Sequence, residues 1–314
     1  MRHPSDPRAS ARAVTAMRSV VAVAALTIGG CGDRAEDAVE TRANDDLVIA
    51  DVGFATPESV IHDEIADVYL VSNISGDPFA KDGDGFISRL APDGSVLALR
   101  WIDSSRTSTR LDAPKGLALT AEHLWVADID TLRRFDRQTG EFAGSVPIEG
   151  STFLNDVTVG PDGELYVTDS GFGPGFEPNG SDAIWRVAAD LSVRALCQDP
   201  TLGNPNGIAY GNVDLFAVSW TTGEFALVGE KGPMAPVKLP TAQLDGLVRT
   251  PDGRWLISSW AGRCVYELAP NGTATVVVAE VDTPADIGFD GTRMRILIPS
   301  FSSDRVIVRR LPEK

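Results

Sequence analysis

The sequence is short of cysteine, histidine and basic residues. Its 314 residues include 3 Cys and 3 His, which excludes a disulfide framework and a cysteine-rich zinc site and disfavours a catalytic site of several imidazoles. Lys and Arg number 28 against 44 Asp and Glu, so the net charge is −16. Because an acidic surface repels phosphate backbones, we expect no nucleic-acid partner.

Long hydrophobic runs are also lacking, and the run at residues 19–30 is too short to anchor a chain in a bilayer. Arg18 precedes it and two glycines end it, as in a secretory signal peptide. Cys31 follows directly, and residues 28–31 resemble a bacterial lipobox, whose cysteine is lipidated and becomes the mature N-terminus. We expect residues 1–30 to be a lipoprotein signal peptide. An ordinary secretory signal with a chance cysteine is the alternative.

Residues 31–46 lack hydrophobic periodicity, and we expect the lipidated Cys31 to be followed by a flexible tether. The prediction is a lipoprotein of the bacterial cell envelope that faces the periplasm, attached to the outer membrane through Cys31. The other two cysteines, Cys197 and Cys264, lie in strand-like runs of different repeats. We expect them to be buried thiols without a bridge.

What the sequence has in abundance is turns, with 30 Gly and 20 Pro, and a repeated unit. Six segments combine a turn, a short apolar strand, a Gly/Asp turn and a second strand. They begin with residues 57–60, 114–117, 154–157, 205–208, 244–247 and 284–287. Four strands in each interval are typical of a propeller blade, and no amphipathic helix of useful length lies between them. We therefore predict an all-β, six-bladed β-propeller over residues 47–314.

The sixth repeat is one strand short, because only three residues follow Leu311. At the other end, residues 47–54 form a strand-like run that has no blade of its own. We expect this N-terminal strand to complete the last blade. Such a closure pairs both exposed sheet edges.

The second residue of each repeat occupies an equivalent place at one end of the central channel. Around the ring these residues are Glu58, Lys115, Asn155, Asn206, Asp245 and Ala285. Four of them offer side-chain oxygens, which suit a hard cation such as Ca²⁺, whereas zinc and copper favour the Cys or His that the ring lacks. For any single Asn or Asp before Gly, capping of a turn is the alternative. Lys115 would oppose a cation unless it snorkels away or pairs with an anionic substrate group.

The ring positions also carry a family resemblance. The segments concerned are Glu58-Ser59, Leu154-Asn155-Asp156-Val157, Pro205-Asn206-Gly207 and Leu244-Asp245-Gly246-Leu247. Residues 47–311 resemble the family of senescence marker protein (regucalcin), gluconolactonase and luciferin-regenerating enzyme, and more distantly diisopropylfluorophosphatase and paraoxonase. The resemblance implies Ca²⁺, or another divalent cation such as Mg²⁺, Mn²⁺ or Zn²⁺, bound on the axis by Glu58, Asn155, Asn206 and Asp245. It also implies hydrolysis of sugar lactones and related esters. Lys115, an insertion in blade one and the lack of a histidine matching the paraoxonase dyad depart from the pattern.

A second ring is expected where the second strands end. Its members are Asn73, Asp128, Asp169, Trp220, Trp260 and Phe301. If all of them face the ligand, one wall of the pocket is polar and the other aromatic, which suits a substrate with a hydroxylated edge and a flat or apolar edge. The alternative is that the polar members cap turns and the aromatic members pack between blades.

Other motifs are weaker. Residues 82–85, Asp-Gly-Asp-Gly, resemble the start of a calcium loop, but the glutamate that such a loop needs is replaced by Ala91. We expect a mobile turn in the blade-one insertion. No serine-hydrolase elbow, Walker loop or dinucleotide loop occurs in the sequence.

Two functions remain open. The first is a metal-dependent hydrolase of lactones or related esters, in which the metal polarises the carbonyl of a small-molecule substrate. Asp245 would act as general base, and Lys115 would pair with a carboxylate product or stabilise the oxyanion. The second is a lipid-anchored, non-catalytic propeller of the NHL-like kind that binds ligands or proteins and uses the ion only to stiffen its channel.

Overall fold

The computed structural model describes residues 39–42, 46–105 and 110–311. The expected signal peptide, Cys31 and most of the expected tether therefore lie outside the described residues. Within them, short strands dominate and helix is confined to three single 3₁₀ turns, Pro174–Phe176, Pro200–Leu202 and Phe301–Ser303. No helix in these ranges is long and apolar enough to cross a membrane.

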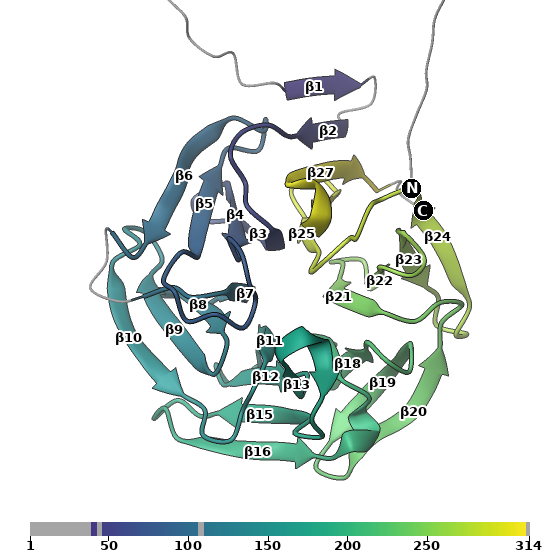
Figure 1. Ribbon diagram of the computed structural model, residues 1–314. Helices are drawn as coiled ribbons and strands as arrows, with labels where there is room; N and C mark the ends of the chain where they lie inside the picture. Colours follow the sequence, from purple (N-terminus) through teal and green to yellow (C-terminus); the bar gives the residue numbers. More distant parts are fainter. Residues whose placement is uncertain (1–38, 43–45, 106–109, 312–314) are drawn as a thin grey trace, which may run out of the picture. The chain divides into compact units, whose positions relative to one another are not determined.

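Six antiparallel sheets stand in a ring (Figure 1), which confirms the six-bladed β-propeller. Blades 1 and 2 consist of β3 (Pro57–Asp63), β4 (Val68–Asn73), β5 (Phe86–Leu90) and β6 (Val96–Asp103), then β7 (Pro114–Leu119), β8 (His123–Asp128), β9 (Thr131–Asp136) and β10 (Phe142–Pro147). Blade 3 consists of β11 (Leu154–Val159), β12 (Leu165–Asp169), β15 (Ala183–Val187) and β16 (Val193–Gln198). Blades 4 and 5 consist of β17 (Pro205–Tyr210), β18 (Leu215–Ser219), β19 (Glu224–Gly229) and β20 (Gly232–Lys238), then β21 (Leu244–Arg249), β22 (Trp255–Ser259), β23 (Cys264–Leu268) and β24 (Ala274–Val278).

The sixth blade joins the two ends of the propeller. It contains β25 (Gly288–Asp290), β26 (Arg295–Ser300), β27 (Arg305–Arg310), β2 (Asp46–Ile49) and β1 (Val39–Arg42). Strand β2 pairs with β27, with Leu47 opposite Val308 and Ile49 opposite Val306, which confirms the predicted closure. The strand ends at Ile49, earlier than expected, because Asp51 turns the backbone with a φ of 58°. Strand β1 pairs with the outer edge of β2 in a stretch where we expected only a flexible tether.

The core is divided into clusters, one between each pair of neighbouring blades. In the second strand of blade 1, Val68 and Leu70 pack toward blade 2, whereas Tyr69 and Val71 pack toward blade 6. Alternate side chains of a strand point to opposite faces, so a strand that is apolar throughout can serve two interfaces. The same division places the buried, unbridged thiols of Cys197 and Cys264 in two different clusters, as expected.

The first strands of the blades surround the centre and approach one another closely. A Cβ on Gly207 would lie 2.3 Å from the carbonyl oxygen of Asp245, and a Cβ on Gly246 would lie 2.3 Å from the backbone nitrogen of Ile287. Glycine at the third position of these repeats is therefore a packing requirement. The second residues of the repeats in blades 1 to 5 line one cavity at the centre of the ring.

Candidate functional site

The same irregularity occurs in the first strands of blades 1 to 5. In each of these strands the pairing with the second strand shifts register at the second and third residues of the repeat, for example between Pro57 and Val60 and between Leu244 and Leu247. Bulges of this kind re-aim side chains out of the sheet. They turn the second residues toward the channel, where they form the floor of one cavity.

This cavity has a volume of about 290 Å³. The predicted ring residues that line it are Glu58, Lys115, Asn155, Asn206 and Asp245, all at most 5% exposed. Ala285, the sixth position, supplies no polar group. The structure thus brings together the residues that the repeat register places in one ring.

Four of these residues share a property that no other described residue has. Glu58 Oε2, Asn155 Oδ1, Asn206 Oδ1 and Asp245 Oδ1 are the buried side-chain oxygens of the described residues that lack a hydrogen-bond partner. We call these four residues the oxygen ring. The carboxamide of Asn155 is also oriented, because its Nδ2 donates to Ser170 Oγ at 3.1 Å. A buried acceptor without a donor is costly, so a missing ligand is the simplest account of all four oxygens.

The charges around the oxygen ring are unbalanced. Burial raises the pKa of Glu58 well above its usual range, and the nearby carboxylates of Asp245 and Asp286 raise it further. Burial and Asp286 raise the pKa of Asp245 in the same way. In the described part of the chain, no group of three or more His, Cys, Asp or Glu side chains is placed to hold a metal ion. A cation at this point would therefore depend on the amide oxygens as well as on the two carboxylates.

Among the described residues that line the cavity, Lys115 is the one with a basic side chain. Its Nζ donates to the carbonyl oxygen of Ala113 at 3.1 Å and lies 4.2 Å from the centre of the Phe153 ring. Burial lowers the pKa of Lys115 to about 8, although the negative charge of Glu58 opposes this shift. One carbonyl occupies one of its three N–H donors, so the ammonium group can still donate to a ligand in the cavity.

Two further carboxylates, Asp156 and Asp286, escaped the sequence analysis although they belong to the repeats. Each follows a ring position by one residue, and both side chains accept hydrogen bonds from neighbouring blades. Asp156 accepts from the backbone N–H of Ile208 at 2.8 Å, and Asp286 accepts from Ser59 Oγ. Burial raises the pKa of Asp286 to about 7. The sequence signal that could have identified them is an acidic residue at the third position of the repeat.

The polar half of the second predicted ring is placed differently from the expectation. Asn73, Asp128 and Asp169 are 0% exposed and do not line the cavity. Asp128 accepts from two backbone N–H groups before β7 and from Arg133 Nε, and Asp169 accepts from three backbone N–H groups. Asn73 accepts from the N–H of Ala55. We call Asn73, Asp128 and Asp169 the capping set, because short polar side chains beside turns satisfy backbone amides.

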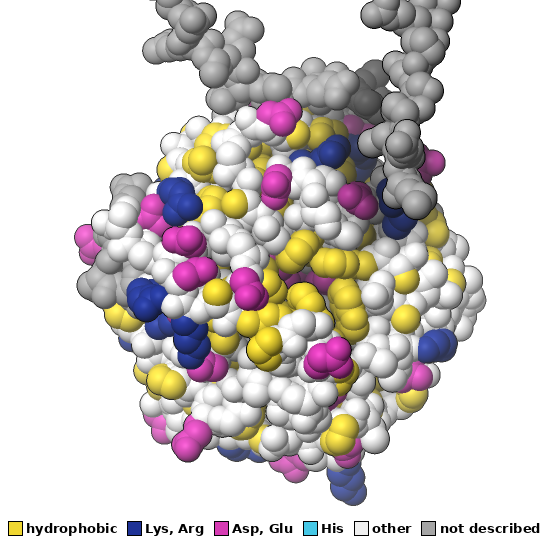
Figure 2. Space-filling view, in the orientation of Figure 1, with side chains coloured by type: hydrophobic (Ala, Val, Ile, Leu, Met, Phe, Trp, Pro, Cys, Tyr) yellow, Lys and Arg dark blue, Asp and Glu magenta, His cyan; other side chains and the backbone are white. Residues whose placement is uncertain are grey.

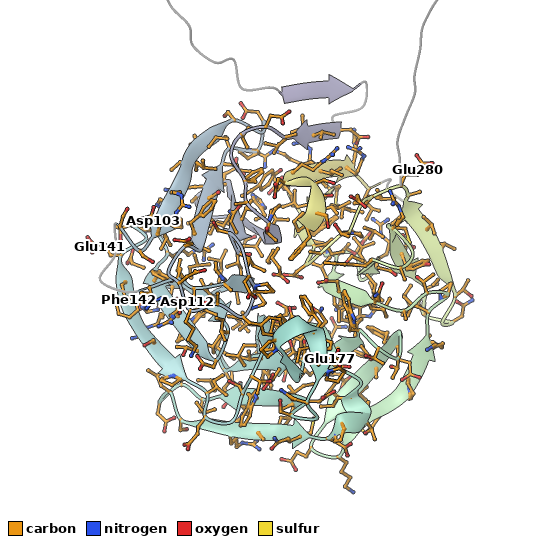
Figure 3. All side chains as sticks on the ribbon, in the orientation of Figure 1. Asp103, Asp112, Glu141, Phe142, Glu177 and Glu280 are labelled. Carbon is orange, nitrogen blue, oxygen red and sulfur yellow. The ribbon has the colours of Figure 1, made fainter. Side chains whose placement is uncertain are left out.

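The aromatic half of that ring does line the cavity, and it is joined by phenylalanines that the repeat pattern does not reveal. The cavity walls contain Phe153, Phe172, Phe176, Trp220, Trp260 and Phe301, which we call the aromatic wall. Phe172 and Phe176 belong to a hairpin formed by β13 (Phe172–Gly173) and β14 (Glu177–Pro178), inserted between β12 and β15. Glu177, labelled in Figure 3, marks this hairpin. Figure 2 shows hydrophobic side chains gathered around the hollow at the centre of this face.

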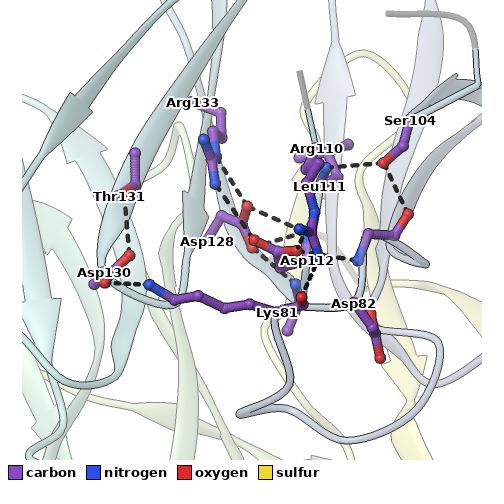
Figure 4. A network of polar contacts seen from close by, with 12 residues as sticks. Lys81, Asp82, Ser104, Arg110, Leu111, Asp112, Asp128, Asp130, Thr131 and Arg133 are labelled. Atoms are coloured by element: carbon purple, nitrogen blue, oxygen red, sulfur yellow. Dashed lines mark hydrogen bonds and ion pairs between the residues drawn. The ribbon is translucent and has the colours of Figure 1, made fainter. Parts of the chain in front are cut away.

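The blade-one insertion, in which we expected a mobile turn at residues 82–85, makes polar contacts with blade 2 and the segment before it. Lys81 pairs with Asp130, and the N–H of Gly83 donates to Asp112 Oδ1 at 3.0 Å (Figure 4). Asp84 N–H donates to Asp82 Oδ1, as in a turn stabilised by an aspartate side chain. Ile74 and Pro78, earlier in the same insertion, line the cavity.

Comparison with known proteins supports the fold. No protein-family model matches this chain, and neither does any curated protein sequence. Among solved structures, a gluconolactonase from Xanthomonas campestris is similar, with a TM-score of 0.66 and 18% identity over 86% of this chain and 91% of that one. A luciferin-regenerating enzyme gives a TM-score of 0.62 at 12% identity, covering 84% of this chain and 94% of that chain. Virginiamycin B lyase from Staphylococcus aureus gives 0.56 at 15% identity, covering 88% and 99%. The resemblance to the gluconolactonase and luciferin-regenerating enzyme group is confirmed at the level of the fold.

Proposed function

We propose that this chain is a hydrolase of lactones or related esters that depends on a divalent cation, with Ca²⁺ as the first candidate. The oxygen ring supports this proposal, because its four residues line one cavity and each has a buried side-chain oxygen without a hydrogen-bond partner. Carboxylate and amide oxygens are the ligands that Ca²⁺ prefers, and waters complete its shell of six to eight. The structural likeness to a gluconolactonase agrees with the substrate class.

Glu58, Asn155, Asn206 and Asp245 would hold the cation. When bound, it would polarise the substrate carbonyl and stabilise developing negative charge on the carbonyl oxygen. We assign Asp245 as general base: it takes a proton from water, whose oxygen bonds to the carbonyl carbon while the ring C–O bond breaks. The proton then passes to the leaving alkoxide, so that a hydroxy acid is released.

Lys115, on the cavity floor, is proposed as a hydrogen-bond donor to the substrate or product. Its free N–H groups would donate to the carbonyl oxygen as that oxygen becomes negative, or to the carboxylate of the product. Burial lowers the pKa of Lys115 to about 8, and the negative charge of Glu58 favours its protonated form. Replacement by Met would keep the volume and remove the donors.

The test is a panel of lactones and aryl esters assayed with purified residues 32–314, with and without a chelator. We expect turnover that the chelator abolishes and that Asp245→Ala reduces by at least about 10³-fold. Asp190→Asn, which changes an exposed turn, is the matched control and should leave turnover unchanged. Full metal binding with no turnover of any substrate would instead indicate the non-catalytic binding propeller.

We further propose that Cys31 carries a lipid and holds the propeller at the periplasmic side of the outer membrane. The support is the lipobox-like sequence that precedes Cys31. Metabolic labelling with a fatty acid should mark the wild-type protein and leave Cys31→Ala unlabelled. Equal labelling of both proteins would refute the anchor.

A further inference from the structure

The aromatic side chains above the cavity floor form two clusters, one from blade 3 and one from blades 4 to 6. In the first cluster Phe153, Phe172 and Phe176 contact one another edge to face, with ring centres 5.9 to 6.0 Å apart. In the second cluster Trp260 lies 5.1 Å from Trp220 and 5.0 Å from Phe301. Each cluster presents ring surface to the same cavity. Edge-to-face packing at these distances holds the rings in place as a preformed surface.

The polar groups of the cavity are concentrated on its floor, and the walls offer few side-chain groups that could bind the hydroxyl groups of a polyhydroxylated ligand. The capping set is turned away and its oxygens are occupied by backbone amides and Arg133. Above the floor, the polar groups among the described residues that line the walls are the side-chain amide of Gln243 and the indole N–H groups of Trp220 and Trp260. Hydroxyl groups of a sugar lactone that lie against the aromatic wall would lose hydrogen bonds to water and find few replacements there, at a cost for each such group.

The hairpin that completes the aromatic wall is held in a strained form. Phe176 has a φ of 59°, follows Gly175 at φ 75°, and remains 48% exposed at the mouth of the cavity. A bulky residue in the left-handed region is uncommon, and such strain gathers at ligand sites. Phe79 of the anchored blade-one insertion supports it from behind, at 5.3 Å between ring centres. Both segments are additions to the four-stranded repeat.

We propose that the ligand of this cavity is a lactone or ester that bears an aromatic or bulky apolar substituent, which lies between the two halves of the aromatic wall while the carbonyl reaches the oxygen ring. This inference rests on the proposed function for the ester group. The apolar character of the substituent follows from the aromatic wall alone. It excludes gluconolactone as the preferred substrate.

The experiment uses matched ligands with and without a phenyl group. Calorimetric titration compares 6-phenyl-2-piperidinone with 2-piperidinone, two lactams that resist hydrolysis, in the presence of Ca²⁺. Kinetics compare 6-phenyl-δ-valerolactone with D-glucono-δ-lactone. We expect the phenyl lactam to bind at least about tenfold more tightly than 2-piperidinone. We expect the phenyl lactone to have a kcat/KM at least about tenfold higher than that of gluconolactone.

Variants locate the effect in the wall. Phe176→Ala, at the exposed mouth, and Trp220→Ala should each weaken the binding of the phenyl lactam much more than that of 2-piperidinone, so that most of the preference for phenyl is lost. Leu97→Ala, an exposed apolar residue of the outer strand β6, is the control and should change neither ligand. Two variants at separate sites keep the test valid if one of them does not fold.

The outcomes separate this inference from the proposed function. Selective binding of the phenyl lactam with no turnover of any lactone would support the aromatic wall as a ligand site and overturn the hydrolase. Turnover with equal or better use of gluconolactone would support the hydrolase and overturn the apolar substrate. A preference for phenyl that survives both wall variants would also overturn the inference.

Discussion

The oxygen ring and the capping set contain the same kinds of side chain at regular positions of the same repeat, yet their surroundings are opposite. The capping set accepts hydrogen bonds from nearby backbone amides, so its oxygens are part of the fold. The oxygen ring is as deeply buried but each member has an unpartnered oxygen. A buried, satisfied oxygen stabilises the chain, whereas a buried, unsatisfied oxygen indicates a ligand.

The largest expected effect breaks the capping set. Asp128→Asn replaces a carboxylate that serves both backbone amides and Arg133, and its new amide N–H groups would face the guanidinium. We expect a loss of about 3 kcal/mol in the free energy of unfolding, measured in urea, because the fully buried carboxylate that accepts from the N–H of Ala113 and pairs with Arg133 is lost. Metal affinity should be unchanged. If the affinity falls while stability holds, the two groups are not functionally distinct.

A smaller effect concerns the oxygen ring and its cation. Calcium at about one hundred times its dissociation constant should add about 2.7 kcal/mol to the stability of the folded protein. Glu58→Gln should weaken this response and raise the stability of the metal-free protein at pH 7, because it removes a buried carboxyl group whose pKa is raised, whereas Asn73→Ala should keep the full response. Thermal unfolding with calcium and with a chelator measures both. Identical curves for the wild type under the two conditions would contradict a metal site.

The smallest effect sharpens the comparison through pH. Burial raises the folded-state pKa values of Glu58, Asp245 and Asp286, the last to about 7. Carboxyl groups with raised pKa values bind protons more tightly in the folded than in the unfolded chain. The free energy of unfolding of the metal-free protein should therefore increase by about 1 to 2 kcal/mol as the pH is lowered from 7 to about 5. Calcium should remove or reverse this trend. Urea unfolding at several pH values, with and without chelator, tests it, and a metal-free stability that falls on acidification would refute it.

The fold and the floor of the site could be predicted because both follow from one repeated register. Once Glu58 and Asn155 are seen to occupy equivalent places in blades 1 and 3, a propeller brings them to one axis. The capping set could not be distinguished in the same way, since whether an Asp side chain turns to a backbone amide or to a cavity depends on bulges and turns that its own repeat does not specify. The phenylalanines of the wall were missed for a related reason. Phe172 and Phe176 belong to an insertion, where no repeat constrains their position.

The closure of blade 6 gives this chain an unusual dependence on its two extremities. Arg309 Nη1 donates to the carbonyl of Leu47, a partner 262 positions earlier. During synthesis, β2 leaves the ribosome long before β27 exists. The pairing of β2 with β27, which closes the propeller, can therefore form only after nearly the whole chain has emerged. A force applied at the amino-terminal side would act first on this pairing. Loss of the pairing would leave β27 as an unpaired edge strand that could pair with another copy of the chain.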